Sequence, residues 1–305
     1  MNDSVLEQIK LLFRRASCLP PLPATVMNVI HEIDEGEASA KRLEQIISSD
    51  PPFVADLLRL ANAHEQHEID EGSLRPLIMR LGVRAVRSFA MSTVLQQVLS
   101  KADEMEPMER YRLSRSAVAT AFFSKYVFGR LHKTRNIQSR FTADEIYAAG
   151  LLSNIGISLL ARVSPDSYGR ARFHAMRAKL PFEEAFKRLV GADLPSLTAS
   201  ACEAWNFPPV YTEIMNGLGT PWKSEKEFSA VCCVSYGRYL AWKAGCAFEA
   251  WEFDFEPMLE VEAEAGMPEE EFQVVCPIVL TNTDYVIGLG NSQPSEAASR
   301  YPEVA

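Results

Sequence analysis

The amino-acid sequence predicts an all-α fold, a bundle of many helices. Hydrophobic residues make up 47% of the 305-residue chain, which is enough to bury a sizeable core. The chain has only 15 glycines, few turn pairs such as Asn-Gly, and no segment with the apolar-polar alternation of a half-buried strand. Apolar residues recur instead at three- and four-residue spacing, which favours helices over a β-sandwich or barrel.

Charge is unevenly distributed along the chain. The formal net charge is −9, yet residues 1–140 carry 19 basic against 17 acidic side chains, and residues 141–305 carry 12 against 23. Residues 249–271 hold ten carboxylates and no base, which indicates either a solvated surface or an acidic face for a basic partner. This balance disfavours nonspecific binding to nucleic acid.

Two features of the sequence bear on its location in the cell. The N-terminus lacks the basic-then-apolar order of a signal peptide, and no uninterrupted apolar run reaches the roughly 20 residues of a membrane span. We therefore expect a cytoplasmic protein with no membrane partner. The six cysteines include no Cys-x-x-Cys pair and lie mostly in apolar helical context, so we expect reduced core thiols rather than disulfides or a zinc site.

Capping signals place the helices of the first hundred residues. An amphipathic helix is expected over residues 4–16, and the prolines of LPPLP (residues 19–23) then fix an extended segment before a helix that begins at about Ala24. Ser39 is the expected N-cap of the next helix. Asp50, which is followed by two prolines, predicts one more helix start.

A long helix is expected over residues 107–130, and a buried helix follows it after a basic linker. Thr142 and Glu145 match a capping box, so the second helix is predicted to begin there and to run through the apolar residues 148–160. Gly150 and Gly156 would let a neighbouring helix approach closely.

Ser153 and Asn154 form a polar pair inside this apolar stretch, AAGLLSNIGISLL. A buried polar group needs a hydrogen-bond partner or a function. On the residues alone, the pair is interpreted either as hydrogen-bonded core polarity or as part of a functional site.

Further helices are expected towards the C-terminus. Pro165, Pro181 and Asp193 each mark a helix start, and the residues from Ser224 to Glu227 form a second capping box before a long apolar helix. At least two more helices are expected over residues 257–290. The tail, residues 291–305, is predicted to be disordered.

Several of these motifs, in this order, resemble the HDOD domain, a bacterial signalling relative of the HD-type metal phosphohydrolases. They are LPPLP, SxDPPFVADLLRLAN, the Leu81-Gly82 pair, AAGLLSNIG and ACEAWNFP, and together they cover about residues 15–220. The segment after Asn62 departs from the family pattern. The resemblance implies an HD-like helical bundle with an N-terminal helical part (1–105), a degenerate HD-like core (106–220) and a C-terminal helical extension (221–290).

The resemblance also implies that the metal site of the HD enzymes is degenerate here. The positions that match the His-Asp doublet are Ser153 and Asn154, and hydroxyl and amide groups are weak ligands for a catalytic divalent ion. Other positions that match family histidines hold no histidine either; they are Arg115, Leu194, Leu218 and Gly219. We therefore expect no catalytic residues, no metal, no cofactor and no enzymatic activity of the family type.

The five histidines of the chain offer one alternative metal site. His64 and His67 lie one helical turn apart among acidic residues, although such a pair in a charged segment is also typical of solvated surface. His31 and His174 are interpreted as ordinary surface residues, and His132 has no recognisable ligand spacing.

The function expected from the resemblance is a noncatalytic signalling or scaffold protein that binds a protein partner or senses a ligand. One alternative is a nucleotide or cyclic-dinucleotide binding module, because Arg80, Arg84 and Arg87 would share one helix face. The favoured interpretation of that face is a solvated surface paired with local acidic residues. Another alternative is a phosphohydrolase with a rebuilt site, for which the available polar groups are Asp144, Glu145, Ser153, Asn154 and Asp193.

Overall fold

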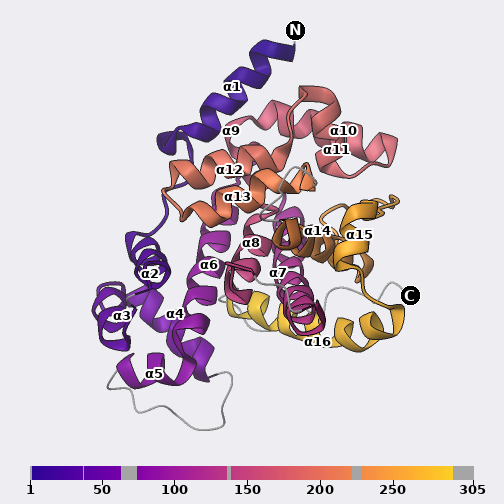
Figure 1. Cartoon of the computed structure of the whole chain (residues 1–305). Helices are drawn as coiled ribbons and strands as arrows, with labels where there is room; N and C mark the ends of the chain where they lie inside the picture. The colour runs from indigo at the N-terminus through magenta and orange to yellow at the C-terminus, as the bar shows by residue number, and fades with distance from the viewer. Residues whose placement is uncertain (1, 37, 63–73, 136–138, 222–227, 291–305) are drawn as a thin grey trace.

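The computed structural model describes residues 2–36, 38–62, 74–135, 139–221 and 228–290, and its regular elements are all helices (Figure 1). None of the described residues forms a β-strand, so the predicted all-α class is confirmed. The segment with His64 and His67, the predicted capping box from Ser224 to Glu227 and residues 291–305 lie outside the described residues.

Six helices form the N-terminal third of the chain. They are α1 (Asn2–Arg14), α2 (Ala24–Asp34), α3 (Ala40–Ile47), α4 (Pro51–Asn62), α5 (Leu74–Leu81) and α6 (Val83–Ser100), with a short 3₁₀ helix (Ala16–Cys18) after α1. Helices α2 to α5 gather at one side of the molecule in Figure 1, whereas α1 lies against α12 on the far side of the bundle. The predicted caps are confirmed, since Ser39 Oγ accepts the Arg42 N–H at 3.2 Å and Asp50 Oδ1 accepts the Phe53 N–H at 3.1 Å.

The centre of the bundle is α7 (Pro107–Arg135), which packs against α8 (Ala143–Leu152), α14 (Phe228–Lys243) and α16 (Glu269–Gly290). The helices approach closely where glycine replaces a side chain. A Cβ atom on Gly150 would lie 2.6 Å from Ala121 Cα of α7. A Cβ on Gly156 would meet Leu194 of α12 at 3.1 Å, so both predicted close approaches are confirmed.

The structure corrects the prediction of one continuous helix through residues 148–160. The capping box at Thr142 and Glu145 is confirmed, but the helix ends at Leu152, and α9 (Ile155–Val163) begins after a two-residue turn. Ser153 and Asn154 form that turn. Ser153 Oγ donates a hydrogen bond to the Gly150 carbonyl at 2.8 Å, which satisfies the hydroxyl within the last turn of α8.

The remaining helices complete the bundle around α7 and α8. They are α10 (Pro165–Ala178), α11 (Phe182–Val190), α12 (Leu194–Ala204), α13 (Pro209–Leu218) and α15 (Leu259–Ala265). Helix α13 is an element that the sequence did not predict as separate. Pro165 and Asp193 begin helices as predicted, and Asp193 Oδ2 accepts the Ser196 N–H at 3.2 Å.

One hydrophobic core runs through the described parts of the chain, from Ile9 of α1 to Ile287 of α16. By length and composition alone, residues Ala143–Val163 could cross a membrane, but 89% of that stretch is buried inside the fold, as in a core helix. The six cysteines are free thiols, of which Cys202, Cys232, Cys233 and Cys246 are buried, so they belong to the core as expected. Burial raises the pKa of Cys202 and of Cys232 to about 12, which keeps them protonated at neutral pH.

Candidate ligand-binding site

A cavity of about 450 Å³ opens beside α7, at the turn between α8 and α9. Its lining comes from α7, α9, α11, α13 and α14, from the start of α12, and from the extended segment 247–258, which we call the strap, together with the start of α15. A volume of this size is typical of sites that hold a small molecule. The cavity lies where the degenerate metal site was expected, because Asn154 is part of its lining.

Asn154 and Ser116 form a buried polar contact at the cavity. The Asn154 Nδ2 donates to the Ser116 Oγ at 3.3 Å, and the two side chains are 6% and 9% exposed. Ser116 stands on α7 and Asn154 at the α8–α9 turn, so the turn brings the amide to the long helix. This contact explains the buried Asn154 as hydrogen-bonded polarity that also faces a cavity.

Three of the six positions matched to the metal site line the cavity, namely Asn154, Leu218 and Gly219. The other three do not. Ser153 turns back onto the Gly150 carbonyl. Leu194, 2% exposed, begins α12 and packs against Gly156.

Arg115 points away from the cavity, which corrects its expected place in the degenerate site. Its Nε lies 3.4 Å from Asp284 Oδ1 of α16, and its Nη1 donates to the Gly245 carbonyl at 3.1 Å. The neighbouring residue on α7, Ser116, lines the cavity instead. Burial acts to lower the pKa of Arg115, but nearby groups, Asp284 among them, outweigh it and raise that pKa above the ordinary arginine value.

The donor groups at the positions that match the family's metal ligands do not fit a catalytic divalent metal. The matched positions that face it offer an amide, an aliphatic side chain and a glycine, with the Ser116 hydroxyl beside them. Such groups are poor ligands for a hard or borderline cation and do not activate a bound water. Within the described ranges, moreover, no three His, Cys, Asp or Glu side chains come together as a metal site would require.

Asp193 and Gly219 pack tightly against each other at the cavity. Asp193 is the N-cap of α12, and its Oδ2 also accepts the Ser196 hydroxyl at 2.9 Å. A Cβ on Gly219 would lie 2.6 to 2.7 Å from the three carboxylate atoms of Asp193. Glycine at position 219 therefore lets the end of α13 cover one face of this carboxylate.

A partly buried ion pair also lines the cavity. Arg238 of α14 lies 2.6 Å from Glu183 of α11, and both side chains are about one-fifth exposed. Burial acts to lower the pKa of Arg238, but the charge and hydrogen bond of Glu183, together with the charges of Glu249 and Asp193, outweigh it and raise that pKa. Close by, Glu249 of the strap accepts the Phe182 N–H at 2.8 Å, and burial raises the pKa of this carboxyl.

Aromatic side chains form the outer wall. The Trp242 ring of α14 lies 6.1 Å from the Phe253 ring and 5.9 Å from the Phe255 ring, centroid to centroid. The two phenylalanine rings are 6.4 Å apart. All three line the cavity. This wall was not predicted, because the alternation of aromatic and acidic residues along 251–256 was overlooked; such alternation is typical of an extended segment with one packed face.

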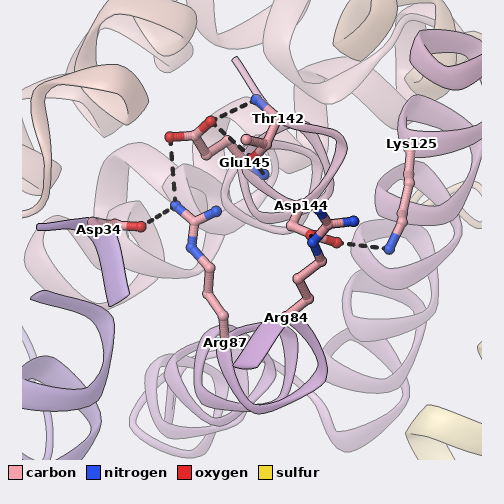
Figure 2. A network of polar contacts seen from close by, with 7 residues as sticks. All are labelled: Asp34, Arg84, Arg87, Lys125, Thr142, Asp144 and Glu145. Atoms are coloured by element: carbon pink, nitrogen blue, oxygen red, sulfur yellow. Dashed lines mark hydrogen bonds and ion pairs between the residues drawn. The ribbon is translucent and has the colours of Figure 1, made fainter. Parts of the chain in front are cut away.

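The three arginines proposed for nucleotide binding do not form one open face, and Figure 2 shows the contacts of two of them, Arg84 and Arg87. Arg87 is only 4% exposed, and its guanidinium contacts Asp34 of α2 and lies 3.8 Å from Glu145 of α8. It also donates to the Tyr211 hydroxyl of α13 at 2.7 Å. This network joins the N-terminal helices to the centre of the bundle and leaves Arg87 unavailable to an anion.

Arg84 and Arg80 are exposed, but Arg84 belongs to a second contact network. Asp144, whose side chain is 7% exposed, lies 2.8 Å from Lys125 Nζ and 3.5 Å from Arg84 Nε (Figure 2). The acidic groups at the start of α8 are thus paired with bases of α6 and α7. They do not line the cavity, so Asp144 and Glu145 do not converge with Asn154 as a rebuilt site would need.

Two of the three histidines in the described residues, His31 and His132, make structural contacts. His31 Nε2 lies 2.7 Å from the Asn206 carbonyl and joins α2 to the turn after α12. His132 stacks on Phe128 within α7.

The acidic stretch 249–271 is only partly solvated. Glu249 is turned into the fold, Glu271 pairs with Arg130 at 3.7 Å, and Glu269 pairs with Lys243. The exposed remainder lies on the strap, on α15 and at the start of α16; it consists of Glu252, Asp254, Glu256, Glu260, Glu262 and Glu270.

Comparison with known proteins identifies one family over about two thirds of the chain. A model of the HDOD domain family matches residues 19–218. An uncharacterized protein of Treponema pallidum (strain Nichols) is 23% identical over 225 residues, which are 73% of this chain and 42% of that protein. The chain therefore spans less than half the length of this relative.

Solved structures share the fold. An HDOD domain protein of unknown function from Geobacter sulfurreducens has a TM-score of 0.69 at 14% identity, over 92% of this chain and 98% of its own. A protein from Marinobacter aquaeolei VT8, provisionally named a signal transduction protein, has a TM-score of 0.68 at 21% identity, over 89% of this chain and 59% of its own. One from Shewanella amazonensis SB2B, provisionally named a phosphohydrolase, has a TM-score of 0.60 at 17% identity, over 92% and 95%. Identities this low establish the fold alone.

Proposed function

Because the chain belongs to the HDOD domain family, as the order of its motifs predicted, we propose that it is a noncatalytic signalling protein that senses a ligand in the cavity beside Asn154. One observation carries this proposal. The position of the family's metal site is occupied by groups unsuited to metal catalysis, yet the space beside them has stayed open at about 450 Å³ instead of being filled by core side chains.

The relatives support the signalling part of the proposal. The Marinobacter protein carries a signal transduction name, and the chain corresponds to 59% of it. A ligand in the cavity would contact α7, α13, α14 and the strap at once. It could therefore alter how the exposed acidic strap and α15 meet a basic partner protein.

The phosphohydrolase alternative rests on the name of the Shewanella protein. In this chain its chemistry would need carboxylates that converge with Asn154, but Asp144 and Glu145 are engaged at the start of α8. The nucleotide alternative would need Arg87, whose guanidinium is buried against Asp34. The nucleotide alternative has no observation in its favour, and the phosphohydrolase alternative has one, namely that Asp193 lines the cavity together with Asn154.

Catalysis and ligand sensing are tested on the full chain in separate assays. We expect no stoichiometric metal in the purified protein, and no hydrolysis of bis-p-nitrophenyl phosphate or cyclic di-GMP with added manganese or iron. Turnover that disappears in Asn154→Ala would overturn the noncatalytic proposal.

The sensing part is tested by thermal unfolding with a metabolite library. A true cavity ligand raises the Tm of the wild type, and the rise is lost in Ala247→Trp, because residue 247 lines the cavity and a large side chain would fill it. Ala250→Trp is the matched control, since Ala250 is exposed on the same segment and is not part of the lining. Ligand shifts that are equal in the two variants would contradict binding in the cavity.

A further inference from the structure

The cavity is completed by a part of the chain that the family match does not cover. The match ends at residue 218, whereas Trp242, Phe253, Phe255 and Glu256 all line the cavity. The strap packs its aromatic rings on α14 and exposes the acidic residues between them. The chemistry of the cavity is therefore set largely by this chain's own C-terminal residues.

The cavity is negatively charged. Five carboxyl groups line it against two basic groups. Glu183 is neutralised by Arg238 at 2.6 Å, and Glu184 by Arg188 at 2.7 Å. Asp193, Glu249 and Glu256 have no ion-pair partner within 4 Å among the described residues, and Lys187 is the remaining base of the lining.

The position that would attract an anion is already taken. The N-terminus of a helix favours negative charge, and at α12 the Asp193 carboxylate occupies it through the Ser196 N–H and hydroxyl. A phosphate or carboxylate ligand would meet this charge directly and would be repelled. The cavity therefore selects against the nucleotide class that the sequence left open.

The aromatic wall favours a positive charge. Trp242, Phe253 and Phe255 lie within 5.9 to 6.4 Å of one another, centroid to centroid, and all three face the cavity. The faces of aromatic rings carry partial negative charge and attract ammonium groups, most strongly where water is excluded. A cation in the cavity would have carboxylates on one side and aromatic rings on the other. Both kinds of group would then compensate for the water that the cation loses on binding.

The Ser235 hydroxyl at the cavity lacks a hydrogen-bond partner among the described residues and could bind a neutral polar group of the ligand. Ser235 of α14 lines the cavity, and its Oγ is buried without a hydrogen-bond partner in the described part of the chain. A buried hydroxyl with no partner is costly, so a ligand atom that accepts or donates a hydrogen bond here would remove that cost.

We infer that the cavity binds a small organic cation, an ammonium compound whose charge lies between Asp193, Glu256 and the rings of Trp242, Phe253 and Phe255. The inference rests on the proposed sensing function and names its ligand class. An ammonium group can be primary or quaternary, and a basic side chain of a partner protein carries similar chemistry, so the experiment includes a probe for each source.

The test is calorimetric titration of the full chain with matched probes. Choline and phenethylamine represent the quaternary and primary ammonium groups, 3,3-dimethylbutanol is the neutral isostere of choline, and inorganic phosphate is the anion. A short lysine-containing peptide represents a partner's side chain. We expect one of the two small amines to bind at least tenfold more tightly than the isostere and the peptide, with no heat from phosphate.

Two charge-removing variants and one control locate the binding. Asp193→Asn keeps an N-cap for α12 while it removes the charge, so we expect about a tenfold loss of amine affinity without loss of the fold. Glu256→Gln should weaken binding severalfold. Glu252→Gln, on the same strap but outside the lining, should leave the affinity unchanged.

The outcomes separate the inference from the proposed function. Tighter binding of the peptide, equal binding of choline and its isostere, or equal affinity in the Glu256 and Glu252 variants would overturn the small-cation inference. If phosphate or a neutral compound bound instead, and Ala247→Trp abolished that binding, the inference would fail while ligand sensing stood. Metal-dependent hydrolysis lost in Asn154→Ala would remove both.

Discussion

Asp34 is held at the end of α2 in an environment that opposes its charge. One carboxyl oxygen contacts the Arg87 guanidinium, while the other, Oδ2, is buried without a hydrogen-bond partner in the described residues. Burial raises the pKa of Asp34 from 3.8 to about 6; the Arg87 charge opposes this shift and the Glu145 charge adds to it. Between these two pH values the folded protein holds a proton that the unfolded chain has released.

This proton makes one part of the stability depend on pH. Because the folded pKa is the higher one, the contribution of Asp34 is fully favourable below about pH 4 and is lost as the pH rises to about 6. The free energy of unfolding of the wild type minus that of Asp34→Asn should therefore fall across this window and level off above it. Urea unfolding of both proteins from pH 3.5 to 7.5 measures the difference. A difference that grew with pH would show that the Arg87 ion pair outweighs burial.

The positions matched to the family's metal ligands show how far a sequence motif can place single residues. AAGLLSNIG places Asn154 at the cavity, but the match for the long helix selected Arg115 where Ser116 is the lining residue. One position along an α-helix turns a side chain by about 100°, so an error of a single residue moves it to another face. Arg87 was misassigned to the surface for a related reason, because its partners Asp34 and Glu145 come from distant helices that no local pattern reveals.

Among the elements, the contact of α8 with α7 depends most clearly on one residue. Gly150 has the Ala121 Cα 2.6 Å from the place where a Cβ would stand, and this neighbour is backbone that cannot rotate away. Gly150→Ala should therefore push the helices apart and lower the free energy of unfolding by about 2 kcal/mol, within the usual cost of overpacking.

Gly169→Ala in α10 is the matched control for the Gly150 variant. A Cβ at Gly169 would meet nothing within 4 Å, so the better helix propensity of alanine should stabilise the protein by up to about 1 kcal/mol. Chemical denaturation of the two variants and the wild type makes the comparison. Equal effects of the two substitutions would contradict the close packing of α7 and α8.

Helix starts could be predicted because capping is local chemistry. Ser39, Thr142 and Asp193 each accept a backbone N–H three residues ahead, as their sequence context indicated. The break at Ser153 and Asn154 could not be predicted in this way. It depends on the Asn154 amide reaching Ser116 of α7, a contact 38 residues away in the sequence.

For the whole molecule, the family resemblance predicted the bundle, since the matched residues 19–218 agree with the motifs over about 15–220. Three of the six positions that it matched to the metal site line the cavity. What it could not predict is the wall made by α14 and the strap. The alternating exposure of residues 251–256 is present in the sequence, but its partner, the Tyr239 and Trp242 face of α14, is known only from tertiary packing.

This wall also implies that residues 221–290 are part of the same folding unit as the residues before them. Helix α14 lies along α7, with Val231, Cys232, Cys233 and Val234 completely buried, and the hydrophobic core continues into α16. A chain that ends at residue 220 would expose the apolar surface of α7 that α14 covers. Exposing this surface to water is unfavourable, so we expect the shortened chain to lose its close packing.

We therefore expect the full chain to unfold in one cooperative transition and the chain 1–220 to show none. Scanning calorimetry of the full chain should give equal calorimetric and van't Hoff enthalpies. Far-ultraviolet circular dichroism should follow the same curve as the fluorescence of the four tryptophans, which include Trp205 in the family region and Trp242 in α14. The shortened chain should retain helical circular dichroism while it binds a hydrophobic dye and melts without a heat-absorption peak. If it melted cooperatively instead, the extension would be a separable domain, and the cavity would be a contact between two units rather than a feature of one core.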